Sequence, residues 1–195
     1  MTKPSNLLVA LIATVGLGVA SGVQANTMGK DAHDTAYKNA AAQYTTDKAA
    51  CNNLSGNAKD ICVEEAKGKE KVAKAEADAA YKNTPKAREA ARTARADASY
   101  NVAKEKCDDQ TGNAKDVCVK EAKAAHVRAT ADAKVDRVAA DTRNASAEKT
   151  AEARRDATED KRDADYKVAV EKCDALAGTA KDSCVKNAKM HYGKS

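Results

Sequence analysis

The chain contains no phenylalanine and no tryptophan, and aromatic residues fill only 3% of its 195 positions. Large aliphatic side chains are also scarce: residues 26–195 hold 16 Leu, Ile, Val and Met residues in total, against 41 alanines. A packed core needs roughly 20% of large apolar residues, so the composition argues against a compact globular domain. Only two prolines and nine glycines interrupt the chain. Alanine, lysine, arginine and glutamate favour helices, and long, thin, mostly helical structure is the expected outcome.

Long apolar runs are absent except near the N-terminus. An apolar segment runs from Leu7 to Val19, and Val23-Gln24-Ala25 then has the small-x-small pattern of a cleavage site. An uncleaved membrane anchor is the alternative interpretation, but such an anchor needs ~20 apolar residues. We therefore expect residues 1–25 to be a secretory signal peptide that is removed between Ala25 and Asn26, leaving no stable membrane span. Export leads to an oxidising compartment, and the periplasm is the expected location.

Charge of one sign does not accumulate anywhere along the rest of the chain. Without Lys3, 33 basic and 29 acidic residues remain, a net charge of +4, with both signs finely interspersed. A nucleic-acid-binding surface clusters its positive charge, whereas interspersed charge is typical of solvated helices. We expect no nucleic-acid partner.

All six cysteines belong to a twelve-residue unit that occurs three times, at Cys51 to Cys62, Cys107 to Cys118 and Cys173 to Cys184. In each unit the cysteines lie symmetrically about a Gly-Asn or Gly-Thr pair. This symmetry predicts a tight turn between two antiparallel helices that is closed by one disulfide, because helix axes about 8 to 10 Å apart suit a Cα separation of ~5.5 Å. In the alternative, one unbroken helix, the two cysteines would lie ~16 Å apart along the axis and could bridge only between chains. Thiol redox chemistry and metal binding are further alternatives, although the spacing lacks the close cysteine pairs of such sites.

Other positions recur around each cysteine pair. The central glycine can take the left-handed conformation that ends the incoming helix. The residue after it is expected to be the N-cap of the next helix, with an aspartate three positions on as its capping-box partner. A tyrosine seven residues before the first cysteine shares its helix face and should pack against the hairpin. These positions are Gly56, Gly112 and Gly178; Asn57, Asn113 and Thr179; Asp60, Asp116 and Asp182; and Tyr44, Tyr100 and Tyr166.

Few helix breakers separate the hairpins. Thr84-Pro85 reads as an N-cap followed by proline at the first helical position, and Gly68 is a candidate kink. Residues 113–177 contain neither Gly nor Pro, enough for one helix of up to ~95 Å, with a break or bend expected near Asn144 to Ser146. Small apolar residues follow a heptad spacing in this stretch, at Ala124, Ala131, Val138 and Ala145, joined by Val135.

The charged stretch beyond that seam is expected to rest on ion pairs within one helix. Arg155 with Glu159 and Lys161 with Asp165 lie four residues apart, and each such pair contributes only ~0.2 to 0.5 kcal/mol. The same stretch, with Asp160 and Asp163, could attract divalent cations, but a self-paired charged face is the preferred interpretation.

Nothing in the sequence specifies a reaction. The chain has no Gly-x-Ser-x-Gly, His-Glu-x-x-His or phosphate-binding glycine loop, and a thin helical chain offers no dry pocket for a nucleophile and its base. His33, His126 and His191 fall at unrelated places in the repeat and are expected to face solvent. We expect no enzymatic activity, no catalytic residue, no cofactor and no bound metal.

Two stretches resemble known families in composition. Ala87 to Asp97 and Glu148 to Ala157, rich in Ala, Lys, Arg, Glu and Asp, are similar to the central helical region of TolA-type envelope proteins and to late-embryogenesis-abundant (LEA) desiccation protectants. The Leu-x-Gly-x-Ala-Lys pattern beside the cysteines, as in Leu54 to Lys59, resembles PsiF-type periplasmic repeats. LEA proteins lack such a cysteine repeat, however, and PsiF-type repeats space their cysteines more widely.

The sequence therefore predicts an all-α, elongated repeat protein with three disulfide-stapled helical hairpins joined by long Ala/Lys/Glu-rich helices. After the signal peptide (1–25), the first repeat spans 26–80, the second 81–140, and a charged helix with the third 141–195. The expected function is a non-enzymatic scaffold or spacer of the cell envelope that contacts envelope proteins or surfaces through its helix faces. An LEA-like stress protectant is the alternative, and a thiol or metal buffer a remote one.

Overall fold

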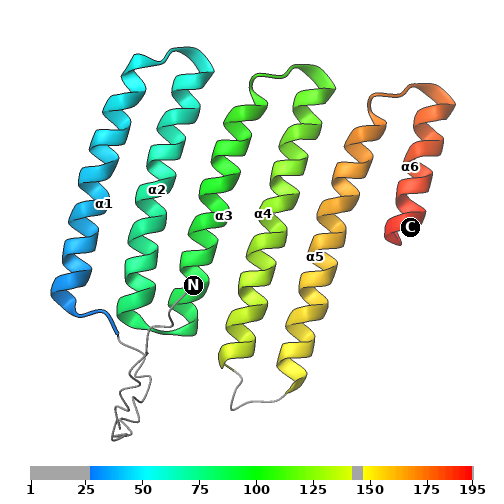
Figure 1. The fold of residues 1–195 in the computed structure, drawn as a ribbon. Helices are drawn as coiled ribbons and strands as arrows, with labels where there is room; N and C mark the ends of the chain where they lie inside the picture. Colours follow the sequence, from blue (N-terminus) through cyan, green and yellow to red (C-terminus); the bar gives the residue numbers. More distant parts are fainter. Residues whose placement is uncertain (1–26, 142–146, 195) are drawn as a thin grey trace, which may run out of the picture.

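The computed structural model describes residues 27–141 and 147–194, and these form helices without strands. The elements are α1 (Lys30–Ala50), a 3₁₀ turn η1 (Cys51–Asn53), α2 (Gly56–Lys82), α3 (Pro85–Cys107), α4 (Gly112–Asp141), α5 (Ala147–Cys173) and α6 (Gly178–Tyr192). They lie side by side in a single up-and-down layer, with the three cysteine corners along one rim (Figure 1). Each of these helices packs only against the helix before it and the helix after it. The all-α hairpin repeat expected from the sequence is confirmed.

Alanine builds the seams between neighbouring helices. Apart from Gly68, the buried side of every helix consists of alanines and the first cysteine of each corner, and no large aliphatic or aromatic side chain in the described ranges is fully buried. Ala124 and Ala131, on the heptad seam expected from the sequence, are among these buried residues, whereas Ala145 lies outside the described residues. Small side chains let helix axes approach closely, but each one removes little apolar area from water. The layer is therefore held by many weak contacts.

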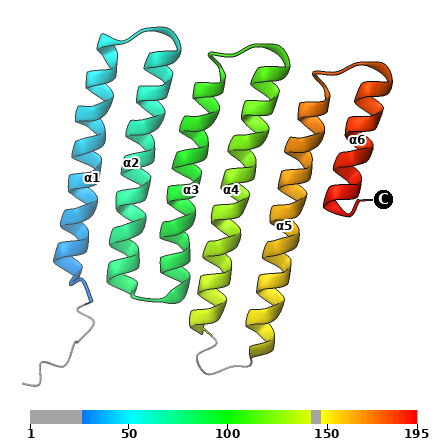
Figure 2. The same ribbon diagram turned by 45° about the vertical axis from the view of Figure 1, so that its right-hand side comes forward.

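The turn between the first two repeats follows the predicted chemistry. Asn83 ends α2 in the left-handed conformation, with φ of 46°. Thr84 is the N-cap of α3 and accepts a hydrogen bond of 3.1 Å from the backbone N–H of Ala87, and Pro85 occupies the first helical position. This short turn folds α3 back along α2, so that the outer arm of one hairpin becomes the neighbour of the next hairpin (Figure 2).

The long Ala-, Lys- and Glu-rich helices are themselves the arms of the hairpins, and a short turn after Lys82 joins the first hairpin to the second. The stretch 113–177, which contains neither glycine nor proline, does not form one helix. Helix α4 ends at Asp141, and α5 begins at Ala147 and packs against α4. The break expected near Asn144 to Ser146 and the signal peptide with its Ala25 to Asn26 junction lie outside the described residues. In the ranges 27–141 and 147–194, no helix combines the length and apolar character that crossing a membrane requires.

Gly68 is a point of close helix approach, not a kink. Helix α2 continues through it, and the residue is buried against α3. A Cβ atom at position 68 would lie 2.9 Å from the Cβ of Ala98, closer than two carbon atoms normally approach. The missing side chain therefore sets how near α2 and α3 lie to each other.

Candidate functional site

The cysteine corners form as the sequence predicts. Disulfides join Cys51 to Cys62, Cys107 to Cys118 and Cys173 to Cys184, each with a Cα separation of 5.7 Å. The first cysteine of each pair is completely buried. Three disulfides with no free cysteine in the described ranges fit the expectation of an oxidising environment.

The glycine of each corner adopts the left-handed conformation, as expected, but at a different place. Gly56, Gly112 and Gly178 have φ values of 55°, 56° and 54°. Each is the first residue of the outgoing helix, and the incoming α-helix has already ended five or six residues earlier. The corner is therefore longer than the predicted two-residue junction.

The expected N-cap role of the residue after that glycine is wrong. Ser55 and Ala177 occupy the N-cap positions of α2 and α6, and neither forms a side-chain cap hydrogen bond. Instead, the side-chain amide of Asn57 donates to the backbone carbonyl of Glu105 in the next repeat, at 2.9 Å. Asn113 makes the same bond to Glu171, at 3.0 Å. The position that looked like a local cap joins one repeat to the next.

Ion pairs recur at the same seams. Glu65 of α2 pairs with Lys106 of α3 at 3.8 Å, and the equivalent Glu121 of α4 pairs with Lys172 of α5 at 2.6 Å. Further along, Glu76 pairs with Arg95, and Asp132 with Lys161. An acid on the outgoing helix thus meets a base on the incoming helix in both seams. Exposed pairs of this kind contribute little each, but their repetition fixes the register between helices.

Cross-helix pairs replace one of the ion pairs expected within the charged helix α5, that of Lys161 with Asp165. Lys161 and Asp165 bind residues of α4, namely Asp132 and Arg128, rather than each other. Asp163 pairs with Lys194, which lies beyond α6. In the described part of the chain, no three His, Cys, Asp or Glu side chains gather in a way that could hold a metal ion.

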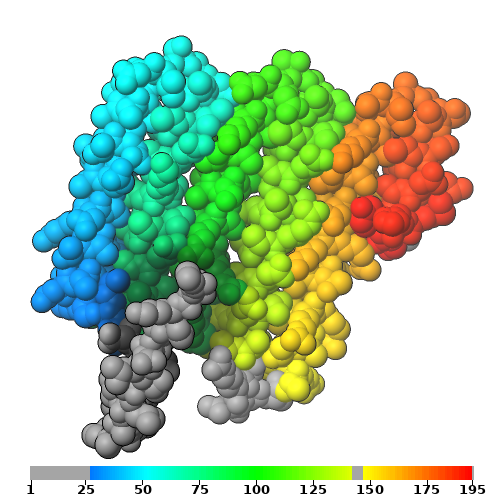
Figure 3. Space-filling model, in the orientation of Figure 1, coloured from blue at the N-terminus to red at the C-terminus, as the bar shows by residue number. Residues whose placement is uncertain are grey.

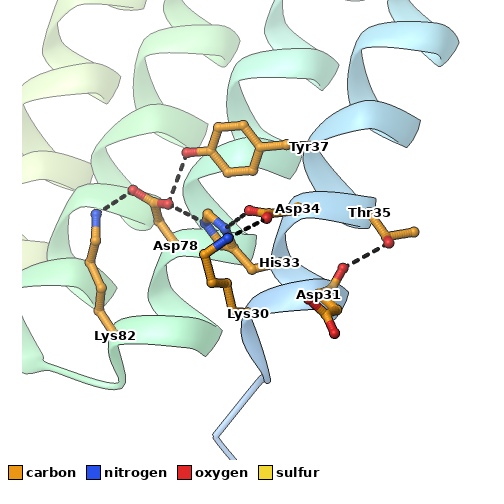
Figure 4. Close-up of polar contacts among 8 residues, drawn as sticks. All are labelled: Lys30, Asp31, His33, Asp34, Thr35, Tyr37, Asp78 and Lys82. Atoms are coloured by element: carbon orange, nitrogen blue, oxygen red, sulfur yellow. Dashed lines mark hydrogen bonds and ion pairs between the residues drawn. The ribbon is translucent and has the colours of Figure 1, made fainter.

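A cluster of polar side chains joins the lower ends of α1 and α2 through hydrogen bonds (Figure 4). Asp78 of α2 accepts hydrogen bonds from His33 Nε2 at 2.7 Å, from the Tyr37 hydroxyl at 2.8 Å and from Lys82 at 2.6 Å. The hydrogen bonds from Lys82 and then His33 lower the pKa of Asp78 to about 2. The pKa of Tyr37 is raised, first by burial and then by its bond to the Asp78 carboxylate. Sequence reasoning missed this cluster, because its members are 41 and 45 residues apart.

Two of the three histidines do not simply face solvent, which corrects the expectation. The side chain of His33 is only 17% exposed, and its ring lies tilted against those of Tyr37 and Tyr81, with centroids 4.6 and 4.8 Å away. His126 of α4 pairs with Asp97 of α3 at 2.6 Å, and its ring lies 5.4 Å from that of Tyr100. His191 alone is exposed.

The recurring tyrosines contact their own hairpins in the second and third repeats. Besides the contact of Tyr100 with His126, Tyr166 of α5 meets Tyr192 of α6 with ring centroids 6.1 Å apart. Tyr44 instead lies under the ammonium group of Lys48 on its own helix. The predicted packing against the hairpin is thus seen directly for Tyr100 and Tyr166.

Both broad sides of the layer carry shallow grooves between helices, and Figure 3 shows the furrows on one side. A groove of about 760 Å³ follows α4 between α3 and α5, with Lys120, Lys123, Lys134 and Lys167 along it and Val127 on its floor. The opposite side of α4 contributes to a groove of about 460 Å³ beside Tyr100 and His126. Another of about 600 Å³ lies between α2 and α3. These grooves are among the concave surfaces that a partner could contact.

Comparisons of the chain with models of protein families, with curated proteins and with solved structures found no match.

Proposed function

We propose that this protein is an exported, non-enzymatic scaffold or spacer of the cell envelope. The observation that carries the proposal is the repeated join between hairpins: each hairpin is closed by a disulfide, and the same asparagine-to-carbonyl bond connects it to the next one. A chain joined in this way holds its repeats at fixed positions, which a spacer needs before it meets a partner.

The specific pairing of side chains between neighbouring helices favours a scaffold over an LEA-like protectant. A protectant can stay disordered until water is withdrawn or a surface appears, and it needs no particular pairing between helices. Here the acid on the outgoing helix and the base on the incoming helix recur at equivalent positions in two seams. That repetition supports a chain that folds on its own in dilute solution.

The partners of such a scaffold would be envelope proteins or surfaces that contact its broad sides. These sides extend over several helices, and a groove of about 760 Å³ runs along α4. Disulfides support a location outside the reducing cytosol, and the periplasm is the compartment we propose.

Circular dichroism and small-angle scattering of the oxidised chain, with and without reductant, test the proposal. We expect a predominantly helical spectrum and a scattering profile that matches a single layer of six helices, and a loss of helix on reduction. Each bridge closes a segment with a sequence separation of 11, so its removal should cost roughly 3 kcal/mol. A variant with Cys107→Ala and Cys118→Ala separates the effect of one bridge from that of the reductant.

A coil spectrum in dilute buffer that becomes helical only on drying or in alcohol would contradict the scaffold proposal. The protectant interpretation would then replace it. A chain that stays helical but gives an extended scattering profile would instead contradict the packing of the hairpins into one layer. The protein would then be a flexible tether.

A further inference from the structure

The two inner seams between repeats, α2 with α3 and α4 with α5, use equivalent positions. Counted from the first cysteine of each repeat, the outgoing helix presents positions +6, +10, +14 and +17, a stripe with helical spacing. Position +6 holds the asparagine that binds the next repeat, and +14 holds the paired glutamate. The incoming helix provides the basic partners of the ion pairs, a lysine at position −1 and a lysine or arginine at position −12.

Apolar and small residues complete both seams. Position −5 of the incoming helix is valine, Val102 or Val168, and each lines the groove of its seam together with position +17. Position +17 is small, Gly68 or Ala124, and both residues are buried. Position +10, one turn from the asparagine, is Ile61 or Val117. An asparagine hydrogen bond, an ion pair, a valine that lines the groove and a small buried residue thus recur together.

The free edges of the layer differ at every one of these positions. On α6, position +6 is Thr instead of Asn, +10 is Ser instead of Ile or Val, +14 is Asn instead of Glu, and +17 is Met instead of Gly or Ala. On α1, position −12 is Asn instead of a base, −5 is Thr instead of Val, and −1 is Ala instead of Lys. These residues, all exposed, are Thr179, Ser183, Asn187 and Met190 on α6, and Asn39, Thr46 and Ala50 on α1.

We infer that the edges of α1 and α6 are closed to a second copy of this chain by these side chains. The backbone would allow α6 of one copy to pack on α1 of another, as α2 packs on α3, because the helices run in the same up-and-down order. The substitutions remove the asparagine bond, the ion pair and the valine of the seam, and Met190 adds a bulky side chain where the inner seams have none. A polar outer face at the ends of a repeat stack prevents its open-ended growth.

This inference does not depend on the proposed function. It concerns which surfaces of the molecule are closed to a second copy of the chain, and it leaves the broad sides of the layer as surfaces for other partners.

Restoring one edge at a time tests the inference on the full chain. The first variant, called the α1-edge variant, carries Thr46→Val and Ala50→Lys. The second, called the α6-edge variant, carries Thr179→Asn, Ser183→Val, Asn187→Glu and Met190→Ala. Each has only one restored edge, so each alone should remain monomeric. A mixture should form a one-to-one heterodimer in analytical ultracentrifugation, at least about tenfold tighter than either variant with the wild-type chain.

A reversed control isolates the ion pair from the apolar contacts. An α1-edge variant with Ala50→Glu in place of Ala50→Lys presents a like charge to the restored glutamate, so its heterodimer should weaken severalfold. Circular dichroism of each variant verifies the fold before mixing. If the wild-type chain forms head-to-tail oligomers through α1 and α6, or if the folded edge variants do not associate, the inference is wrong.

The converse exchange provides a second measurement. Placing the edge residues in an inner seam, with Asn57→Thr, Ile61→Ser and Glu65→Asn together, should lower the midpoint of thermal unfolding clearly. Asn52→Thr in the exposed corner serves as control and should leave it unchanged. Equal midpoints for the inner-seam variant and the control would contradict the role assigned to these positions.

Discussion

Individual side chains in this protein act mainly by being small or by making one well-placed polar contact. Gly68 allows α2 and α3 to approach each other, and Asn57 reaches across to the following repeat. Asp78 receives three donors from two helices. No large side chain in the described ranges fills a core. Such single positions therefore determine to an unusual extent how each helix packs against its neighbour.

The Asp78 cluster makes the stability of the first hairpin depend on pH. The pKa of Asp78 is about 2 in the folded chain, below the ordinary value of 3.8, so its stabilising contribution is complete above pH ~4 and is lost as the pH falls toward 2. Its side chain is 29% exposed, and with that solvent screening the contribution is about 1 to 2 kcal/mol. We expect Asp78→Asn to destabilise the protein by this amount at pH 7 and to have little effect at pH 2, measured by urea unfolding.

Asp109→Asn is the matched control, because Asp109 lies exposed in a corner. Its effect should be small at both pH values. An equal loss for both variants at pH 7, or an undiminished effect of Asp78→Asn at pH 2, would contradict the assigned role of the cluster.

Adding one methyl group at Gly68 should push two helices apart. Alanine is favoured over glycine in a helix by about 1 kcal/mol, but the new Cβ would lie 2.9 Å from the Cβ of Ala98, and overpacking costs about 1 to 3 kcal/mol. We expect Gly68→Ala to be destabilising on balance in thermal unfolding. Adding Ala98→Gly to this variant should recover part of the lost stability. If Gly68→Ala alone is more stable than the wild-type chain, the two helices can move apart without cost.

Helices in this layer begin and end through different local chemistry, although they share one composition. Helix α3 starts at a threonine whose hydroxyl caps a free backbone N–H. Helix α2 starts after Ser55 without a side-chain cap, because the adjacent disulfide and left-handed Gly56 already fix the corner. Local capping therefore matters most where no covalent bridge defines the turn.

This difference gives a matched pair of substitutions. Thr84→Ala removes the hydrogen bond to Ala87 N and should cost about 1 kcal/mol. Ser55→Ala removes no cap bond and should have little effect in the same chemical denaturation experiment. Similar losses at both positions would show that the corner serine contributes in some other way.

Across the whole molecule, stability should fall from the middle of the layer toward its edges. Helices α2 to α5 each pack between two neighbours, whereas α1 and α6 each have one among the described helices. In hydrogen exchange we expect the amides in the middle of α3 and α4 to be protected longest, and those of α6 and of the central turns of α1 to exchange sooner. Uniform protection would indicate that the layer unfolds as a single cooperative unit.

The parts of this fold that depend on neighbouring residues could be predicted from the sequence. The cysteine pairs, the left-handed glycines and the Thr84-Pro85 start of α3 each have a local signature. The side-by-side packing of the hairpins could not be predicted, because alanine seams are hardly distinct from an alanine-rich surface.

The same limit explains the wrong interpretations. Asn57 occupies a good position for an N-cap, and only the tertiary structure reveals that its amide reaches Glu105. Gly68 resembles a helix breaker until α3 is placed against it. The bonds of His33 and Tyr37 to Asp78 span more than forty residues, so no sequence periodicity indicates the cluster.

The three corners that the disulfides close lie along one rim of the layer (Figure 1), and this placement has a mechanical consequence. If the chain is pulled from its two ends, the helices can peel away from the unbridged rim, but the corner segments cannot straighten. Each bridge has a sequence separation of 11 and so withholds about 35 Å of contour length from the applied force. An oxidised molecule would act as a tether with a fixed maximum extension, and reduction would lengthen it in up to three equal steps.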